Sequence, residues 1–248
     1  MFSSKPRRAH RILVTGASDG IGLLLARAYA RRGHHVLATG RRHIADEKTT
    51  FRSPNVIYRS ADLSEPEEAT RTLIETMQDI GWRRLDLAIL NGATAWVGPP
   101  EDEPVNGIRN QLSVNFSAAI HLAHALAPLL FVANGQLMMV GSTSVNKAQG
   151  AFATYTATKA GLDGLCRSLA EEWQGRADVK IVHPGPTRTN MHAKAGLKLG
   201  LVRLFFMSPR RVSSAIQCAV RRKDVRRRVI TRFFGFRARF SRAGKGRL

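Results

Sequence analysis

Three side chains in the second half of the chain have types and spacing suited to proton transfer. Tyr155 and Lys159 are four residues apart in a predicted helix, so they share one face of it. A free tyrosine has a pKa of about 10, which suits proton transfer poorly at neutral pH, but a neighbouring ammonium lowers it. Ser142, at the end of a predicted strand, could hydrogen-bond a substrate oxygen. The set would suit acid/base chemistry at an alcohol or carbonyl, whereas Tyr-x-x-x-Lys alone is a common coincidence on a surface helix.

A glycine-rich turn near the N-terminus predicts a phosphate-binding loop. Residues 15–22 read TGASDGIG, follow the first predicted strand and open the first predicted helix. Glycines let the backbone approach a pyrophosphate closely, and the helix N-terminus offers free N–H groups to that anion. A purely structural turn is the alternative, which the position between strand and helix disfavours. The residues expected to bind the dinucleotide here are Gly16, Ser18, Asp19, Gly20, Ile21 and Gly22.

The end of the second predicted strand indicates which dinucleotide would bind. Arg41 and Arg42 follow Gly40 there, and no acidic residue occurs before Asp46. An acid at this point would hydrogen-bond an adenosine 2′-hydroxyl, whereas an arginine can pair with a 2′-phosphate, often bidentately. The two arginines therefore favour NADP(H) over NAD(H), with a solvated charged turn as the alternative.

The third predicted strand ends at a further candidate contact. Asp62 is placed to hydrogen-bond the adenine amino group, with Leu63 beside it, and capping of the helix from Glu65 is the alternative role for Asp62.

A nicotinamide bound in its oxidised form would add a second positive charge near Tyr155 and favour the tyrosinate further.

The elements that must position these residues alternate between short apolar runs and longer helical patterns. Alternation of this kind predicts an α/β fold with a doubly wound, parallel, Rossmann-like sheet of about seven strands and helices on both faces. Ligands of such sheets bind at the carboxyl ends of the strands, where the motifs fall. The expected strands are 11–15, 35–39, 56–60, 85–90, 136–140, 179–182 and, more weakly, 228–231, and the expected helices are 21–32, 65–80, 105–131, 152–174 and 209–222, with a short helix in 43–51.

The motifs occur together in the order found in one family. The chain resembles the short-chain dehydrogenase/reductase family over nearly all of residues 11–231, and the thirteen-residue step from Ser142 to Tyr155 also matches that family. The family's usual Asn-Asn-Ala-Gly reads Leu90-Asn91-Gly92-Ala93 here, so this turn is expected to differ in detail. The resemblance rests on the 15–22 loop, Asn91-Gly92-Ala93, Asn115, Ser142, the segment Tyr155 to Lys159, and the segment Pro184 to Thr189.

The resemblance implies a role for each matched residue. Tyr155 would be the acid/base, Ser142 would position the carbonyl oxygen, and Lys159 would bind the nicotinamide ribose and perturb Tyr155. Asn115 would hold a water that relays protons toward Lys159. The remaining implied cofactor contacts are Asn91 at the cofactor edge and, beside the nicotinamide, Pro184, Gly185, Thr187 and Thr189.

The charge of the chain is concentrated at one end. The formal net charge is +21, of which residues 203–248 contribute +14 from 15 Lys/Arg and one acid. We expect a basic N-terminal extension (1–10), one oxidoreductase domain (11–231) and a basic, aromatic C-terminal tail (232–248). Arginines interleaved with phenylalanines in the tail suggest peripheral contact with an anionic membrane, and a solvated tail is the stronger alternative.

Composition also bears on location and partners. Two well-separated cysteines indicate no disulfide framework, and the longest apolar run, 118–133, is short of a spanning helix. A cytoplasmic protein is therefore expected, with no nucleic-acid partner, since no recognition motif accompanies the basic tail. No metal site is predicted, because His, Cys and acidic residues show no ligand spacing. His183 is read as a strand-end packing residue.

Three functional readings remain. The first is an enzyme acting on a small carbonyl or alcohol substrate. The segments expected to line its pocket are 95–99, 143–150 and 190–207, and an apolar lining there would suit an apolar substrate. The second is a non-catalytic dinucleotide-binding regulatory protein, and the third a basic protein associated with nucleic acid. The complete Asn115, Ser142, Tyr155 and Lys159 set favours the enzyme, and the family implies a homodimer or homotetramer.

Overall fold

One β-sheet organises the chain. In the computed structural model, which describes residues 8–44, 47–146, 150–189, 206–222, 227–230 and 240–241, the strands run in the order β3-β2-β1-β4-β5-β6-β7-β8. All neighbours pair in parallel except β8, which is antiparallel to β7. The strands are β1 Arg11–Val14, β2 His35–Gly40, β3 Val56–Ser60, β4 Leu87–Leu90, β5 Gln136–Val140, β6 Asp178–Pro184, β7 Arg227–Ile230 and β8 Phe240–Ser241.

The strand order contains the switch point that the motifs require. The chain builds β1, β2 and β3 toward one edge and then crosses to β4 on the other side of β1. In doubly wound sheets the crevice at such a reversal, outside the carboxyl ends of the strands, receives the ligand. The predicted fold is confirmed. The short β8 was not predicted as a strand and comes from the segment expected to be a tail, the rest of which lies outside the described residues.

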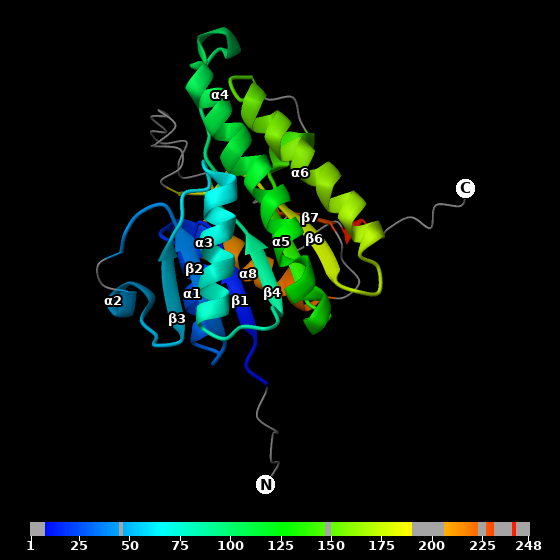
Figure 1. Cartoon of the computed structure of the whole chain (residues 1–248). Coiled ribbons are helices and arrows are strands. Elements are labelled where there is room, and N and C mark those ends of the chain that lie inside the picture. The colour runs from blue at the N-terminus through cyan, green and yellow to red at the C-terminus, as the bar shows by residue number, and fades with distance from the viewer. Residues whose placement is uncertain are drawn as a thin grey trace, which may run out of the picture.

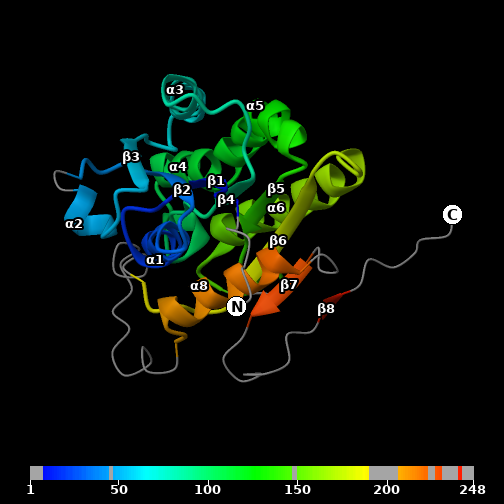
Figure 2. The same cartoon turned by 90° about the horizontal axis from the view of Figure 1, so that it is seen from below.

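Helices cover both faces of the sheet, as Figures 1 and 2 show. On one face α3, α5 and α6 pack on alternate strand residues such as Leu13, and on the other α1 and α8 pack on Ile12 and Val14. Successive side chains of a strand point to opposite faces, so a continuous apolar strand supplies both cores. The helices are α1 Gly20–Ala30, α2 Glu47–Phe51, α3 Pro66–Asp79, α4 Val105–Leu112, α5 Ala118–Ala133, α6 Ala153–Glu172 and α8 Pro209–Arg221.

The helix expected over 105–131 contains a wide turn. Ser113–Ser117 forms a π-helical segment (η2) between α4 and α5, with Asn115 buried inside it. Isolated π turns inside α-helices are frequently found at functional sites.

The continuous helix Val105–Ala133 is long and apolar enough to cross a membrane by length and composition. The sequence argument that the apolar run 118–133 is too short to span a membrane therefore does not hold for the whole helix. Its residues Leu122, Leu126 and Leu130 are buried against the sheet, and 33% of its most apolar stretch is buried in all.

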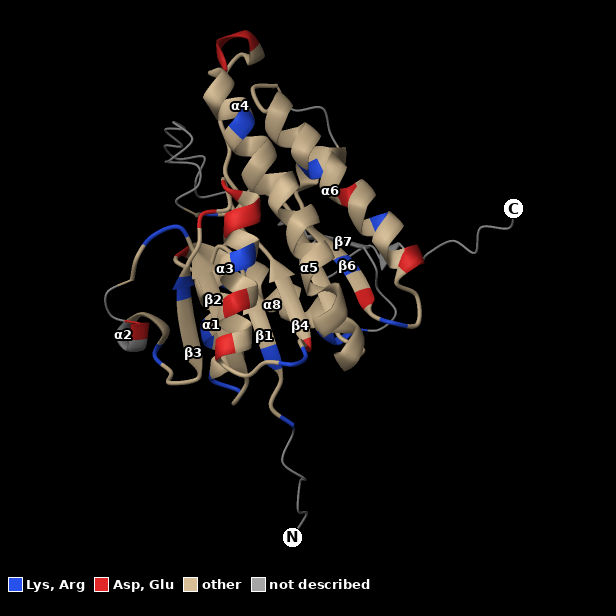
Figure 3. Cartoon of the chain, in the orientation of Figure 1, with Lys and Arg blue, Asp and Glu red and all other residues tan. Residues whose placement is uncertain are grey.

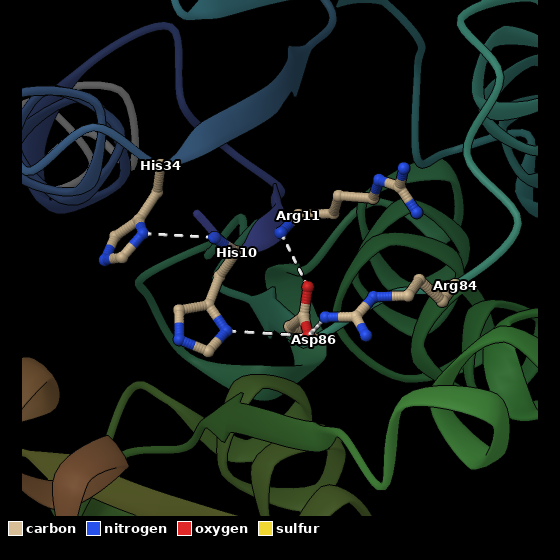
Figure 4. A network of polar contacts seen from close by, with 5 residues as sticks. All are labelled: His10, Arg11, His34, Arg84 and Asp86. Carbon is tan, nitrogen blue, oxygen red and sulfur yellow. Dashed lines mark hydrogen bonds and ion pairs between the residues drawn. The ribbon is translucent and has the colours of Figure 1, made fainter. Parts of the chain in front are cut away.

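A polar network ties together the amino ends of β1 and β4, at the edge of the sheet opposite the motifs (Figure 4). Asp86 accepts a hydrogen bond from the Arg11 backbone N–H (2.8 Å), pairs with Arg84, and lies 3.5 Å from Nδ1 of His10. The His10 backbone N–H donates to Nδ1 of His34 at 3.2 Å. Burial, with a further contribution from His10, lowers the pKa of His34, so the folded chain favours the neutral ring.

Candidate active site

A cavity of about 530 Å³ opens at the carboxyl ends of the strands and brings the predicted residues together. Of the predicted site residues only Gly22, Arg42 and Asn115 do not line it. Those that do are Gly16, Ser18, Asp19, Gly20, Ile21, Arg41, Asp62, Leu63, Asn91, Ser142, Tyr155, Lys159, Pro184, Gly185, Thr187 and Thr189.

The glycine-rich loop is built so that backbone borders the cavity. Gly16 has a φ of +63°, and a Cβ there would lie 2.7 Å from Cα of Gly92. A Cβ on Gly22 would lie 2.2 Å from the Gly16 carbonyl oxygen, which explains a glycine that does not itself line the cavity. Helix α1 begins at Gly20, and Oδ1 of Asp19 accepts a hydrogen bond from the Gly20 N–H at 2.6 Å. Asp19 is therefore the N-cap of α1 as well as a cavity residue.

The two arginines after β2 flank this loop. Arg41 is exposed and lines the cavity, while Nη2 of Arg42 donates to the Ser18 carbonyl at 3.1 Å and lies 3.8 Å from the Asp19 carboxylate. The Tyr58 hydroxyl donates to the Arg42 carbonyl at 2.6 Å and so fixes the backbone of the turn. Arg42 thus holds the loop, and Arg41 is the arginine of the two that lines the cavity.

Asp62, the second residue after β3, lines the cavity and bonds the turn before α3, but it is not the N-cap of that helix. Oδ1 of Asp62 accepts a hydrogen bond from the Ser64 N–H at 3.0 Å and turns the chain toward α3. The N-cap residue of α3 is Glu65, whose side chain makes no capping hydrogen bond. Asp62 is exposed at the cavity, and Leu63 is buried beside it.

The unusual Leu90-Asn91-Gly92-Ala93 turn is well bonded. The backbone N–H groups of Asn91 and Gly92 both donate to Oγ1 of Thr15 at 3.0 Å. Nδ2 of Asn91 donates to the Thr15 carbonyl (3.1 Å) and the Gly16 carbonyl (3.3 Å). A Cβ on Gly92 would lie 2.4 Å from Cδ1 of Leu63, the end of a flexible side chain that would have to move aside. Asn91 therefore shapes the cavity by holding together the loops that follow β1 and β4.

At the other end of the cavity lie Ser142, Tyr155 and Lys159. Burial raises the pKa of Tyr155, and a hydrogen bond with Ser142 opposes that rise. Burial lowers the pKa of Lys159 to about 8. Nζ of Lys159 donates to the Val140 carbonyl at 2.9 Å and lies 5.8 Å from the centre of the Tyr155 ring. The expectation that the neighbouring ammonium lowers the Tyr155 pKa is wrong for the protein alone, because desolvation of the phenolate is the larger effect.

Asn115 is buried behind this end of the cavity. Its Oδ1 accepts from the Thr94 N–H at 2.8 Å, and its Nδ2 donates to the Thr94 carbonyl at 2.9 Å and to Oγ1 of Thr158 at 3.2 Å. The Asn115 amide thus fixes the loop after β4 to the helix that carries Tyr155 and Lys159.

The loop after β6 closes the cavity from the side. Oγ1 of Thr187 donates to the Gly185 carbonyl at 2.8 Å, and the backbone of Met207 bonds to Pro186 and Arg188. The methyl group of Thr189 would be 3.5 Å from a Cβ on Gly20, so this loop reaches the start of α1. Of the apolar pocket residues expected in 190–207, only 206 and 207 are within the described residues.

Helix α4 supplies lining residues that were not predicted from the sequence. Gly107, Asn110 and Gln111 of α4 line the cavity, as do Val114 of η2 and Phe152. Asn110, Gln111 and Val114 lie within about one turn before Asn115, so helical spacing from that residue was the available signal. Among the described residues no group of three or more His, Cys, Asp or Glu side chains could hold a metal ion.

The lining fits a dinucleotide with phosphates at one end and a reacting carbon at the other. The glycine loop leaves backbone and a helix N-terminus where a pyrophosphate would lie, because no Cβ could be accommodated at Gly16 or Gly22. Arg41 and Asp62 border the same end, and Ser142 and Tyr155 the other.

Comparison with known proteins agrees with this geometry. Residues 10–199 match the family described as short chain dehydrogenase. The uncharacterized oxidoreductase YciK of Escherichia coli (strain K12) is 33% identical over 195 residues, covering 74% of this chain and 76% of that protein. The 11-beta-hydroxysteroid dehydrogenase A of Sesamum indicum is 29% identical over 180 residues, 70% of this chain. The chain spans about half the length of that relative and of two from Arabidopsis thaliana.

A solved structure shows the same architecture. The short-chain dehydrogenase from Sphingobium yanoikuyae in complex with NADPH superposes with a TM-score of 0.74 at 26% identity, covering 85% of this chain and 83% of that one. Family match, motif order and fold all agree, and the chain belongs to the short-chain dehydrogenase/reductase family of oxidoreductases.

Proposed function

We propose that this chain is an NADP(H)-dependent oxidoreductase that interconverts a ketone or aldehyde and an alcohol, with Tyr155 as the acid/base. The observation that supports this most is the single cavity that joins the Gly16 loop and Arg41 at one end to Ser142, Tyr155 and Lys159 at the other. A non-catalytic dinucleotide-binding protein would not need a buried tyrosine hydrogen-bonded to a serine at the cavity wall.

In carbonyl reduction, Ser142 orients the substrate oxygen and Tyr155 gives its hydroxyl proton to that oxygen as negative charge develops. The raised pKa of Tyr155 keeps the phenol protonated at neutral pH, which suits an acid in this direction. In alcohol oxidation the same hydroxyl must lose its proton first. A bound nicotinamide supplies the hydride chemistry, and the protein supplies orientation and proton transfer.

Lys159 has a place in both binding and proton transfer. An ammonium has three donors, and one is used by the Val140 carbonyl. A second donor could reach the hydroxyls of the nicotinamide ribose, and the positive charge stabilises tyrosinate when it forms. Asn115 supports this arrangement from behind by bonding Thr158, the residue before Lys159.

The preference for NADP(H) rests on Arg41. Arg41 lines the cavity together with Gly40 and the glycine-rich loop, and Arg42 is held to Ser18 and Asp19. A guanidinium can pair bidentately with a 2′-phosphate. The related Sphingobium yanoikuyae structure was solved with NADPH.

An apolar carbonyl compound suits the remaining wall of the cavity. Trp96, Val114 and Phe152 line it, with the Phe152 ring centre 6.1 Å from that of Tyr155, and aromatic and aliphatic walls with a few polar groups are typical of small-molecule sites. Several relatives carry the name hydroxysteroid dehydrogenase. A panel of apolar and polar ketones scored by NADPH oxidation tests the proposal, and a panel without any turnover would contradict it.

A homodimer or homotetramer is the assembly we propose. Among the described residues, four of the five exposed large hydrophobic side chains lie on the helix Val105–Ala133, including Val105, Leu112 and Ile120. Figure 3 shows this helix almost without charge beside α6. Such a face is covered in many soluble proteins by a second subunit.

For location we propose the cytoplasm, with peripheral membrane contact through residues 232–248 as a second proposal. Nearly all of these residues lie outside the described part of the chain, so the proposal rests on the sequence alone. Co-sedimentation with anionic vesicles at low salt tests it. Binding should fall with added salt and with removal of residues 232–248, and absence of binding would contradict it.

A further inference from the structure

We propose that buried His183 and partly buried Asp163 form a positioning pair that holds the backbone of Ser142 and thereby the hydroxyl that orients the substrate. The proposal deepens the proposed function and rests on it. It comes from a contact at the back of the site, between β6 and α6, where neither residue lines the cavity.

The imidazole of His183 lies between two oxygen atoms. His183 is fully buried in β6, directly before Pro184. Its Nε2 is 2.7 Å from Oδ1 of Asp163, and its Nδ1 is 3.0 Å from the Ser142 carbonyl oxygen. Asp163 lies one turn of α6 after Lys159 and two turns after Tyr155, so the three side chains share a face of that helix.

The chemistry of these partners fixes the tautomer. A carbonyl oxygen can only accept a hydrogen bond, so Nδ1 of His183 must carry a hydrogen to bond Ser142. Two proton arrangements then satisfy Asp163. In one an imidazolium donates from both nitrogens to the carbonyl and to a carboxylate, and in the other a carboxylic acid donates to Nε2 of a neutral ring. In both, Asp163 selects the ring state that donates to Ser142.

The bond to His183 completes a clamp on three successive residues at the end of β5. The Val140 carbonyl accepts from Nζ of Lys159 at 2.9 Å, and the Gly141 N–H donates to the Val182 carbonyl at 2.8 Å. The Ser142 carbonyl accepts from His183. A Cβ on Gly141 would lie 2.6 Å from Nδ1 of His183, so glycine is what lets the ring approach this backbone.

Loss of the His183 hydrogen bond frees the Ser142 peptide group from this clamp. The Ser142 hydroxyl makes the hydrogen bond that opposes the rise in the Tyr155 pKa, and its oxygen accepts from the Ser144 N–H at 3.2 Å. A shift of the serine by about 1 Å can cost on the order of a hundredfold in rate. The expected defect is therefore in kcat, because the dinucleotide end of the cavity is unchanged.

The experiment compares His183→Leu, Asp163→Asn and the control His35→Leu, which removes an exposed histidine at the amino end of β2. His183→Leu should lower kcat by about 10- to 100-fold with little change in NADPH affinity. Asp163→Asn should retain most of kcat, because an amide N–H can donate to Nε2 of a neutral ring whose Nδ1–H still bonds Ser142. His35→Leu should behave as the parent protein.

A second measurement keeps the proposal testable if His183→Leu does not fold. In ¹⁵N NMR of histidine-labelled protein, His183 can be assigned as the ring whose resonances shift in Asp163→Asn. In the parent protein these resonances should show a protonated Nδ1. An unprotonated Nδ1, or parental kcat in folded His183→Leu, overturns the positioning pair. The parent protein and Ser142→Ala separate the two levels: a parent without turnover on the whole carbonyl panel contradicts the proposed function, and if Ser142→Ala is inactive while His183→Leu is fully active only the pair is wrong.

Discussion

Replacing Gly16 by alanine tests how the backbone forms the phosphate end of the cavity. Gly16 has a φ of +63°, and an alanine in that left-handed region costs about 1–2 kcal/mol. The new Cβ would also lie 2.7 Å from Cα of Gly92 and 3.0 Å from Nδ2 of Asn91. Because the first of these is a backbone atom, relief requires the β1 and β4 loops to separate, and overpacking of this kind costs a further 1–3 kcal/mol, roughly.

The matched control is Gly33→Ala in the turn between α1 and β2. Gly33 has a φ of +81°, yet nothing lies within 4 Å of its added Cβ. It should lose only the conformational contribution of about 1–2 kcal/mol, whereas Gly16→Ala should lose about 2–5 kcal/mol of unfolding free energy. Urea unfolding measures both, and fluorescence titration with NADPH should show weakened binding for Gly16→Ala alone. Equal destabilisation of the two variants with equal NADPH affinity would refute the steric reasoning.

Three other predictions concern the cofactor, pH and assembly. Arg41→Asp should lose about 10- to 100-fold in NADPH affinity, the size expected for the loss of a hydrogen bond to a charged group. It should also narrow or invert the preference for NADPH over NADH. An unchanged preference in a fluorescence titration would contradict the role of Arg41. The folded chain holds the pKa of His34 below its unfolded value of about 6.5. The stabilisation from the neutral ring should therefore be complete above that pH, and the free energy of unfolding should fall as the pH drops through it. In urea unfolding, His34→Gln should reduce this loss of stability. A loss of equal size in that variant would exclude His34 as its source. Leu112→Glu, on the exposed apolar face of α4, should shift sedimentation toward the monomer, and a parent protein that is itself monomeric at micromolar concentration would remove the basis for the prediction.

Much of the fold could be predicted because local pattern and global topology agree. The run 136–140 is a strand buried on both faces, and its predicted bounds match β5 without change. The predicted bounds 56–60 also match β3, an edge strand in which Ile57, Arg59 and Ser60 are exposed. Most ends of the long helices moved by one or two residues, since caps such as Asp19 decide where a helix begins, while the predicted start of α8 at 209, after the cap Ser208, is unchanged. The π turn around Asn115 left no mark in the periodicity and could not be predicted.

The site was predictable where a residue type alone carries the chemistry, and less so where contacts decide. The glycines, Ser142, Tyr155 and Lys159 lie at one cavity, as expected. The direction of the Tyr155 pKa was missed because burial, which the sequence does not reveal, is its largest cause. His183 was read as packing only, since its partners Asp163 and Ser142 are 20 and 41 residues away in the chain.

The most direct test of the proposed chemistry is turnover of Tyr155→Phe with the best substrate of the carbonyl panel. The change removes the hydroxyl proton and keeps the buried ring, so NADPH should bind as before. Loss of a positioned acid typically costs about 10²- to 10⁴-fold in rate, and kcat should fall within that range. A folded, NADPH-binding Tyr155→Phe protein that keeps most of its turnover would contradict the assignment of Tyr155 as the acid/base.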